Sequence, residues 1–148
     1  MDNEFNFPFY KLLGDVLRGH FSLSHKTLEK EGLYPGHPPV LFTIYKNDGI
    51  SQKEIAEKTK IKPATVTVMI RRLEKAGFVS KSIDSNDQRI SRIHLTEKGL
   101  NACTNLKKVI SEIDSICLNN FTKDEINSLQ YLLNKVKNNL KENKTELS

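Results

Sequence analysis

Two side chains past the middle of the chain, Asp87 and Arg89, have the types and spacing of a braced cation. The Asp87 carboxylate can hold the Arg89 guanidinium through two parallel hydrogen bonds. On a thin β-hairpin tip, such a guanidinium can enter the narrow, electronegative minor groove of DNA. A loop ion pair alone contributes little to stability. The interpretation therefore depends on the elements around it.

A second set of side chains suits the same task and lies between Pro63 and Ala76. With a helical period, Val66, Ile70 and Leu73 fall on one apolar side together with Met69. The opposite side offers hydroxyl groups, small apolar groups and cations, which can contact bases and phosphates in the major groove. The residues expected to contact DNA are Ser51, Gln52, Lys53, Lys62, Ala64, Thr65, Thr67, Val68, Arg71, Arg72, Lys81, Asp87, Arg89 and Arg92.

The local signals around these residues predict the elements that position them. Residues 51–54 read S-x-x-E, a capping box that begins a short helix. Pro63 suits the first position of a second helix, and Gly77 suits its left-handed end. Residues 79–83 and 91–95 alternate in polarity around a polar tip. The order predicts a helix-turn-helix over 51–76 and a wing over 79–95.

The flanking segments are predicted to be helical. Apolar residues recur with a loose helical period from Phe9 to Leu28, and again after Thr96. A second capping box, at 122–125, begins a last helix whose apolar spacing is typical of packing on another helix. Residues 40–45 are compatible with either a strand or a short buried helix. The fold class is mainly α, or α+β.

The charge of the chain favours a polyanionic partner. The 148 residues carry a formal net charge of +5, and hydrophobic residues make up 37%. Residues 53–92 hold ten Lys and Arg against five Asp and Glu, so this stretch accounts for the whole excess. The first residues show no secretory signal, and no apolar run approaches the roughly 20 residues of a membrane span. We expect a cytoplasmic protein without a membrane partner.

These motifs resemble the MarR family of bacterial regulators. The matching stretches are S-Q-K-E-I-A from Ser51, T-V-T from Thr65, R-L-E-K-A-G-F-V from Arg72, D-S-N-D-Q-R from Asp84 and L-T-E-K-G from Leu95. The resemblance covers nearly the whole chain. It implies a homodimer that binds a pseudo-palindromic DNA operator, and we expect it to act as a repressor. One domain, 1–148, would comprise a winged helix-turn-helix region at 34–95 and dimerisation helices at 1–33 and 97–142.

Two positions depart from the family pattern. Lys62 stands at the expected N-cap of the second helix, where the family often has a short polar residue. That helix start would lack a side-chain cap and gain a cation. Val68 stands on the outer face, where the family often has a polar or basic residue, so base preference at that position is not carried over.

The resemblance also implies that a ligand or a redox event often relieves DNA binding. A small aromatic or lipophilic effector would occupy a crevice lined by His20, Tyr34, His37, Phe42 and Tyr45; packing in the core is an equally good interpretation of these side chains. Zinc is disfavoured because the spacing of the His and Glu residues at 20–37 matches no compact motif, so no metal or cofactor is expected. Cys103 and Cys117 are interpreted as small buried apolar residues rather than redox sensors.

Two other classes of function compete with a regulator. A winged-helix module that binds proteins would show exposed aromatic residues on the outer face of the 63–76 helix, and the sequence has none there. An enzyme would need a nucleophile with a base, a glycine-rich phosphate loop or a metal motif. None of these is recognisable in the sequence, so we expect that the chain is not an enzyme.

Overall fold

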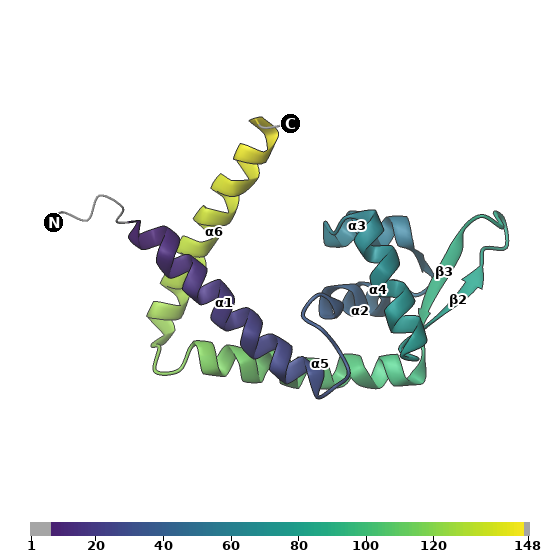
Figure 1. Cartoon of the computed structure of the whole chain (residues 1–148), viewed down its shortest axis with the longest axis horizontal. Coiled ribbons are helices and arrows are strands. Elements are labelled where there is room, and N and C mark those ends of the chain that lie inside the picture. The colour runs from purple at the N-terminus through teal and green to yellow at the C-terminus, as the bar shows by residue number, and fades with distance from the viewer. Residues whose placement is uncertain (1–6, 147–148) are drawn as a thin grey trace. The chain divides into compact units, whose positions relative to one another are not determined.

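The computed structural model of the chain describes residues 7–146 and is mainly helical (Figure 1). Contacts divide the chain into two compact units, residues 1–113 and 114–148, and the boundary falls within the fifth helix. The elements in chain order are α1 (Pro8–Glu29), α2 (His37–Lys46), β1 (Ile50–Ser51), α3 (Gln52–Thr59), α4 (Pro63–Lys75), β2 (Val79–Ile83), β3 (Ser91–Leu95), α5 (Glu97–Cys117) and α6 (Lys123–Glu146).

The small sheet contains the predicted hairpin and one strand that the sequence did not reveal. Strands β2 and β3 pair antiparallel with Val79 opposite Leu95, as expected for a wing. The additional strand β1 pairs with the other edge of β3, with Ser51 opposite Arg92. The strand order is therefore β1-β3-β2. The sheet joins the start of α3 to the wing, so the two parts of the helix-turn-helix region share one backbone framework.

The core of the first unit lies where α2, α3 and α4 pack with the sheet and with α5. The run at 40–45 is a helix, because His37–Lys46 begins with prolines in its first turn, where a missing N–H costs nothing. Its apolar side chains are buried together with those of the neighbouring elements. The fully buried side chains include Leu41, Ile44, Ile55, Val66, Ile70, Leu73, Ile93 and Leu106.

The two long C-terminal helices begin at the predicted caps. The Thr96 hydroxyl accepts a hydrogen bond from the Gly99 N–H at 3.1 Å at the start of α5. At the start of α6, the Glu125 carboxylate accepts from the Thr122 N–H at 2.8 Å, and the Thr122 hydroxyl accepts from the Glu125 N–H at 3.2 Å. This reciprocal pair is the capping box expected at 122–125.

Candidate nucleic-acid interface

Helix α4 presents one buried side and one exposed side. Val66 and Ile70 have no exposed surface, and Met69 packs against the core, so the predicted apolar stripe is confirmed. The helix ends at Lys75, and Gly77, two residues later, has a φ of 82°. The Phe78 N–H returns to the Leu73 carbonyl at 2.9 Å and closes the end. The exposed residues of α4 from the predicted interface are Ala64, Thr65, Thr67, Val68, Arg71 and Arg72.

Side chains from the predicted interface cap α3 and connect it to α4. The Ser51 hydroxyl accepts from the Glu54 N–H at 3.3 Å, and the Glu54 carboxylate accepts from the Ser51 N–H at 2.9 Å. These bonds and the nearby cations lower the pKa of Glu54. The Thr67 hydroxyl donates to the Gln52 amide oxygen at 2.9 Å, which links α4 to α3. Ser51 therefore caps α3, and Thr67, which is exposed, connects α4 to α3.

Lys62 occupies the N-cap of α4 without a side-chain hydrogen bond to the helix. The expectation that this helix start lacks a side-chain cap is therefore confirmed. Lys62 and Lys53 are both exposed near helix N-termini. Helix N-termini favour anions because their N–H groups and dipoles point outward. The two lysines add positive charge at these ends.

The wing tip carries the braced cation that the spacing of Asp87 and Arg89 predicts. The Asp87 carboxylate accepts from Arg89 Nε at 3.1 Å and from the terminal Nη2 at 3.2 Å. It also accepts from the Arg89 backbone N–H at 3.0 Å. These bonds lower the pKa of Asp87. The Arg89 side chain is 90% exposed, so its guanidinium is both oriented and available.

Arg92 lies at the base of the wing and is engaged within the protein. Its guanidinium pairs with Asp84 at 2.6 Å and with Glu54 at 3.4 Å. The Asp84 carboxylate also accepts from two backbone N–H groups of the tip, and these bonds together with Arg92 lower its pKa. Lys81 is likewise paired, with Glu74 of α4 at 3.1 Å. The structure thus places Lys81 and Arg92 as ties between the wing and the helices.

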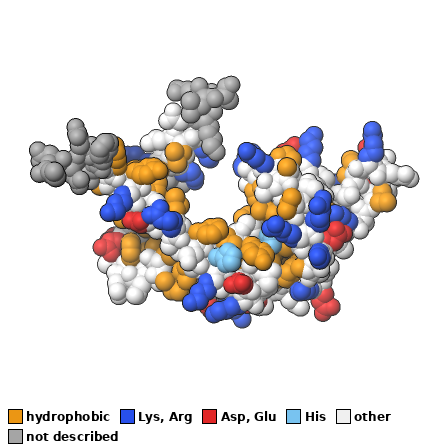
Figure 2. Space-filling model, viewed as in Figure 1, with side chains coloured by type: hydrophobic (Ala, Val, Ile, Leu, Met, Phe, Trp, Pro, Cys, Tyr) orange, Lys and Arg blue, Asp and Glu red, His pale blue; other side chains and the backbone are white. Residues whose placement is uncertain are grey.

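A groove of about 370 Å³ separates the start of α3 from the wing. It brings together four of the predicted residues, because Ser51, Gln52 and Lys53 line one part and Arg89 lines another. Ile90 and Ser91 complete the lining, and sequence reasoning missed both. Their position in the groove depends on the pairing of β1 with β3, which local sequence signals do not indicate. Figure 2 shows Lys and Arg side chains over the region of α3, α4 and the wing.

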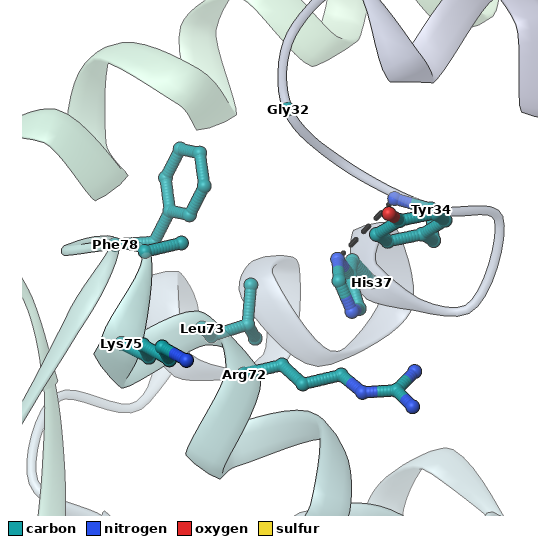
Figure 3. Close-up of a pocket in the computed structure, with 8 residues that line it drawn as sticks. Gly32, Tyr34, His37, Arg72, Leu73, Lys75 and Phe78 are labelled. Atoms are coloured by element: carbon teal, nitrogen blue, oxygen red, sulfur yellow. Dashed lines mark hydrogen bonds between the residues drawn. The ribbon is translucent and has the colours of Figure 1, made fainter.

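A second cavity, of about 430 Å³, lies beside α4 (Figure 3). Of the five residues expected to bind an effector, it contains Tyr34 and His37. Arg72, Lys75 and Phe78 complete much of the lining, and sequence reasoning did not associate them with this site. The other three expected residues do not line it: His20 is exposed, Phe42 packs against the core, and Tyr45 is about half exposed.

His37 is a buried imidazole held in its neutral form. Its Nδ1 accepts a hydrogen bond from the Tyr34 N–H at 3.3 Å, so that nitrogen carries no proton. Burial, followed by the positive charge of Arg72, lowers the pKa of His37 below its usual value. The Tyr34 ring stands edge-on to the His37 ring at 5.5 Å between centroids.

We expect acid to destabilise the protein through His37. A histidine with a lowered folded-state pKa contributes stability above the unfolded pKa of about 6.5, and this contribution is lost as pH falls below that value. Urea unfolding between about pH 7.5 and 5.5 should show the loss, and His37→Gln should flatten the pH dependence. Glu54, Asp84 and Asp87 have lowered pKa values and stay ionised in this window. An equal pH dependence in both proteins would contradict the assignment.

Among residues 7–146, no group of three or more His, Cys, Asp and Glu is arranged to hold a metal ion.

The two cysteines differ in their surroundings. Cys103 is buried, donates weakly to the Leu41 carbonyl at 3.8 Å, and has a pKa raised by burial. The expectation of a buried apolar role is wrong for Cys117, which is exposed on the last turn of α5. A stretch of apolar residues that could span a bilayer is found in none of the helices that the structure describes.

Known proteins resemble this chain in both sequence and structure. The model of the MarR family matches residues 37–91. An uncharacterized HTH-type transcriptional regulator of Bacillus subtilis strain 168, YybA, is 30% identical over 128 residues, covering 86% of this chain and 85% of that protein. The crystal structure of the transcriptional regulator SlyA matches with a TM-score of 0.79 at 27% identity, covering 95% and 99% of the two chains.

A structure that contains DNA also resembles this chain. A mutant of MarR from Escherichia coli, complexed with operator DNA, matches with a TM-score of 0.76 at 25% identity. The match covers 88% of this chain and 94% of that one. The similarity to these proteins therefore extends well beyond the segment that the family model matches.

Proposed function

The chain belongs to the MarR family of transcription regulators, and we propose that it binds a pseudo-palindromic operator in double-stranded DNA as a homodimer. The observation that carries the proposal is the combination of an exposed α4 face with an oriented Arg89 on the adjacent wing. A related protein, MarR of Escherichia coli, has been solved with operator DNA. The exposed α4 face and the oriented Arg89 suit this chain to both grooves of a duplex.

Helix α4 is the element proposed to enter the major groove. A recognition helix uses its N-terminal residues to contact base edges. Here that part of α4 offers Ala64, Thr65 and Val68, which is 43% exposed, and methyl groups of this kind can meet thymine methyls. Arg71 and Arg72 follow on the exposed surface and can reach bases or phosphates.

The wing is proposed to place Arg89 in the minor groove. An inserted arginine gains most where the groove is narrow and its negative potential is strongest. Asp87 fixes the guanidinium in advance, so little side-chain freedom is lost on binding. Lys81 and Arg92, which are paired with acids, support this proposal as residues that position the wing rather than as its main DNA contacts.

Residues 1–33 and 97–142 are proposed to form the dimer interface, and residues 34–95 the DNA-binding region. Large apolar side chains on α1 are exposed, among them Phe9, Leu12, Val16 and Phe21, each more than half exposed. On α6, taken by itself, Tyr131 and Leu133 are also exposed. Large apolar side chains exposed on a helix in this number mark a protein interface. A second copy of this chain would cover both helices.

We propose repression as the output and a small aromatic or lipophilic molecule as the releasing effector. A dimer that covers both grooves of a promoter would exclude the polymerase from it. The cavity beside Tyr34 and His37 supports an effector because Arg72 and Lys75 of α4 line it too. A molecule bound there would contact the helix proposed to read the operator, and so could change its position.

Binding to duplex DNA should depend steeply on salt. The proposed contacts place several exposed cations at phosphates, and each neutralised phosphate adds about 0.9 to the slope of log affinity against log salt. With six or more contacts, affinity should fall by about 1,000-fold between roughly 50 and 200 mM salt. Fluorescence anisotropy with a random duplex and with the DNA upstream of the chain's own gene tests this. A module that binds only proteins would show no affinity for either duplex at low salt.

A further inference from the structure

Three polar side chains at the base of the wing form a hydrogen-bonded series that the proposed DNA interface does not use. The Ser82 hydroxyl lies 2.9 Å from Nε2 of His94, and Nδ1 of His94 lies 3.0 Å from a carboxylate oxygen of Asp48. Ser82 belongs to β2 and His94 to β3, whereas Asp48 lies in the turn after α2. The three residues are separated by up to 46 positions in the chain. No local motif could have revealed them.

The direction of each hydrogen bond follows from the chemistry of the partners. An ionised carboxylate only accepts, so Nδ1 of His94 must carry a proton and donate it to Asp48. In the neutral imidazole, Nε2 then has a free lone pair. The Ser82 hydroxyl is the donor that faces this lone pair. This is the order of groups that activates a serine hydroxyl: a nucleophile, a base and a carboxylate that orients the base.

The backbone holds Asp48 in place beside His94. Gly49 has a φ of 74°, a conformation that glycine adopts without strain, and its N–H donates to the Ile93 carbonyl at 3.0 Å. A Cβ at residue 49 would lie 3.4 Å from Cε1 of His94, so the imidazole sits close against this turn. The orientation of the base is thus set by main-chain contacts as well as by the Asp48 carboxylate.

Ser82 is accessible from solvent. Strand β2 is an edge strand of the sheet, and Ser82 is exposed on it. The His94 side chain is 33% exposed and the Asp48 side chain 76%. Neither of the two cavities described above is lined by Ser82. The site is therefore open to a small, reactive reagent.

The geometry points to Ser82 as an activated hydroxyl that accepts a small acyl group from an activated donor, such as an aryl ester or an acyl phosphate. The hydroxyl oxygen bonds to the carbonyl carbon of the donor while its proton passes to Nε2 of His94. The bond from that carbon to the phenolate or phosphate breaks, and the leaving group takes up the proton. Ser82 ends as an ester and can no longer donate to His94, which would loosen the connection between the two wing strands.

The test is covalent labelling of the purified full-length protein with p-nitrophenyl acetate. We expect an ester on Ser82, located by peptide mass spectrometry and removed by hydroxylamine, which leaves acetylated lysines intact. General-base assistance contributes about 100-fold or more, so His94→Gln should slow labelling of Ser82 by about that factor. Asp48→Asn should slow it too, because the amide can donate to Nδ1 and leave the proton on Nε2, so that the imidazole no longer acts as the base. Ser82→Ala should remove the labile label.

Ser80 provides the matched control within the same strand. It is exposed on β2 and lies directly opposite His94 in the register, yet its hydroxyl is not the one that bonds to Nε2. Ser80→Ala should leave the labelling of Ser82 unchanged. Labelling of Ser82 no faster than that of Ser80, or a rate unaffected by His94→Gln, would show that the three side chains serve only to connect the wing strands. Urea unfolding of each variant checks its fold independently of the acylation result.

Discussion

Replacing Arg89 with alanine is expected to weaken operator binding by about 10- to 100-fold per wing while leaving the fold intact. A hydrogen-bonded charged group contributes about 1.5–3 kcal/mol, and each 1.4 kcal/mol is about ten-fold in affinity. The Arg89 guanidinium bonds to Asp87 and is otherwise 90% exposed, so its removal takes away no core packing. Anisotropy with an operator duplex measures the affinity, and urea unfolding measures the stability.

Two variants separate the guanidinium from its surroundings. Lys46→Ala removes an exposed cation in the last turn of α2 that belongs neither to the predicted DNA contacts nor to the proposed dimer segments. It should leave DNA affinity unchanged. Asp87→Asn in the Arg89→Ala background removes the carboxylate that would otherwise repel phosphates, and should restore part of the lost affinity. Wild-type affinity in Arg89→Ala would mean that the wing is not the minor-groove element.

The helix-turn-helix and the wing could be predicted because their signals are local. The Ser51–Glu54 capping box and Pro63 mark the helix starts, and Gly77 ends α4 where a left-handed residue is required. The brace between Asp87 and Arg89 spans two residues, so its geometry also follows from spacing. Each of these features is decided by backbone preferences within one or two turns.

The roles of other residues depend on contacts that spacing does not encode. Arg92 looks like one more cation for DNA in the sequence, whereas its partner Glu54 lies 38 positions away. The association of His37 with Arg72 likewise depends on how α2 packs beside α4. The charge count of residues 53–92 therefore indicates a polyanionic partner. It does not indicate which cations, such as Arg92, are already paired with acids of the same chain.

Gly99→Ala is expected to be the most destabilising single change considered, at about 3 kcal/mol or more. An ideal Cβ at residue 99 would lie 2.1 Å from the Phe78 carbonyl oxygen, and backbone cannot yield as a flexible side chain can. The same contact region ties the end of α4 to α5, because the Thr96 hydroxyl donates to the Gly77 carbonyl and Lys98 Nζ to the Ala76 carbonyl, both at 2.6 Å. Operator affinity should fall together with stability, since α4 would lose this support.

Gly19→Ala supplies the opposite expectation for the same chemical change. Gly19 also lies within a helix, but a Cβ there would meet nothing within 4 Å. Alanine in a helix interior is more stable than glycine by about 0.5–1 kcal/mol, because it loses less backbone freedom on folding. Urea unfolding of the two variants beside the wild type should therefore move the midpoint in opposite directions. A wild-type midpoint for Gly99→Ala would show that α5 does not approach residue 78 so closely, and that the glycine of the L-T-E-K-G motif serves another purpose.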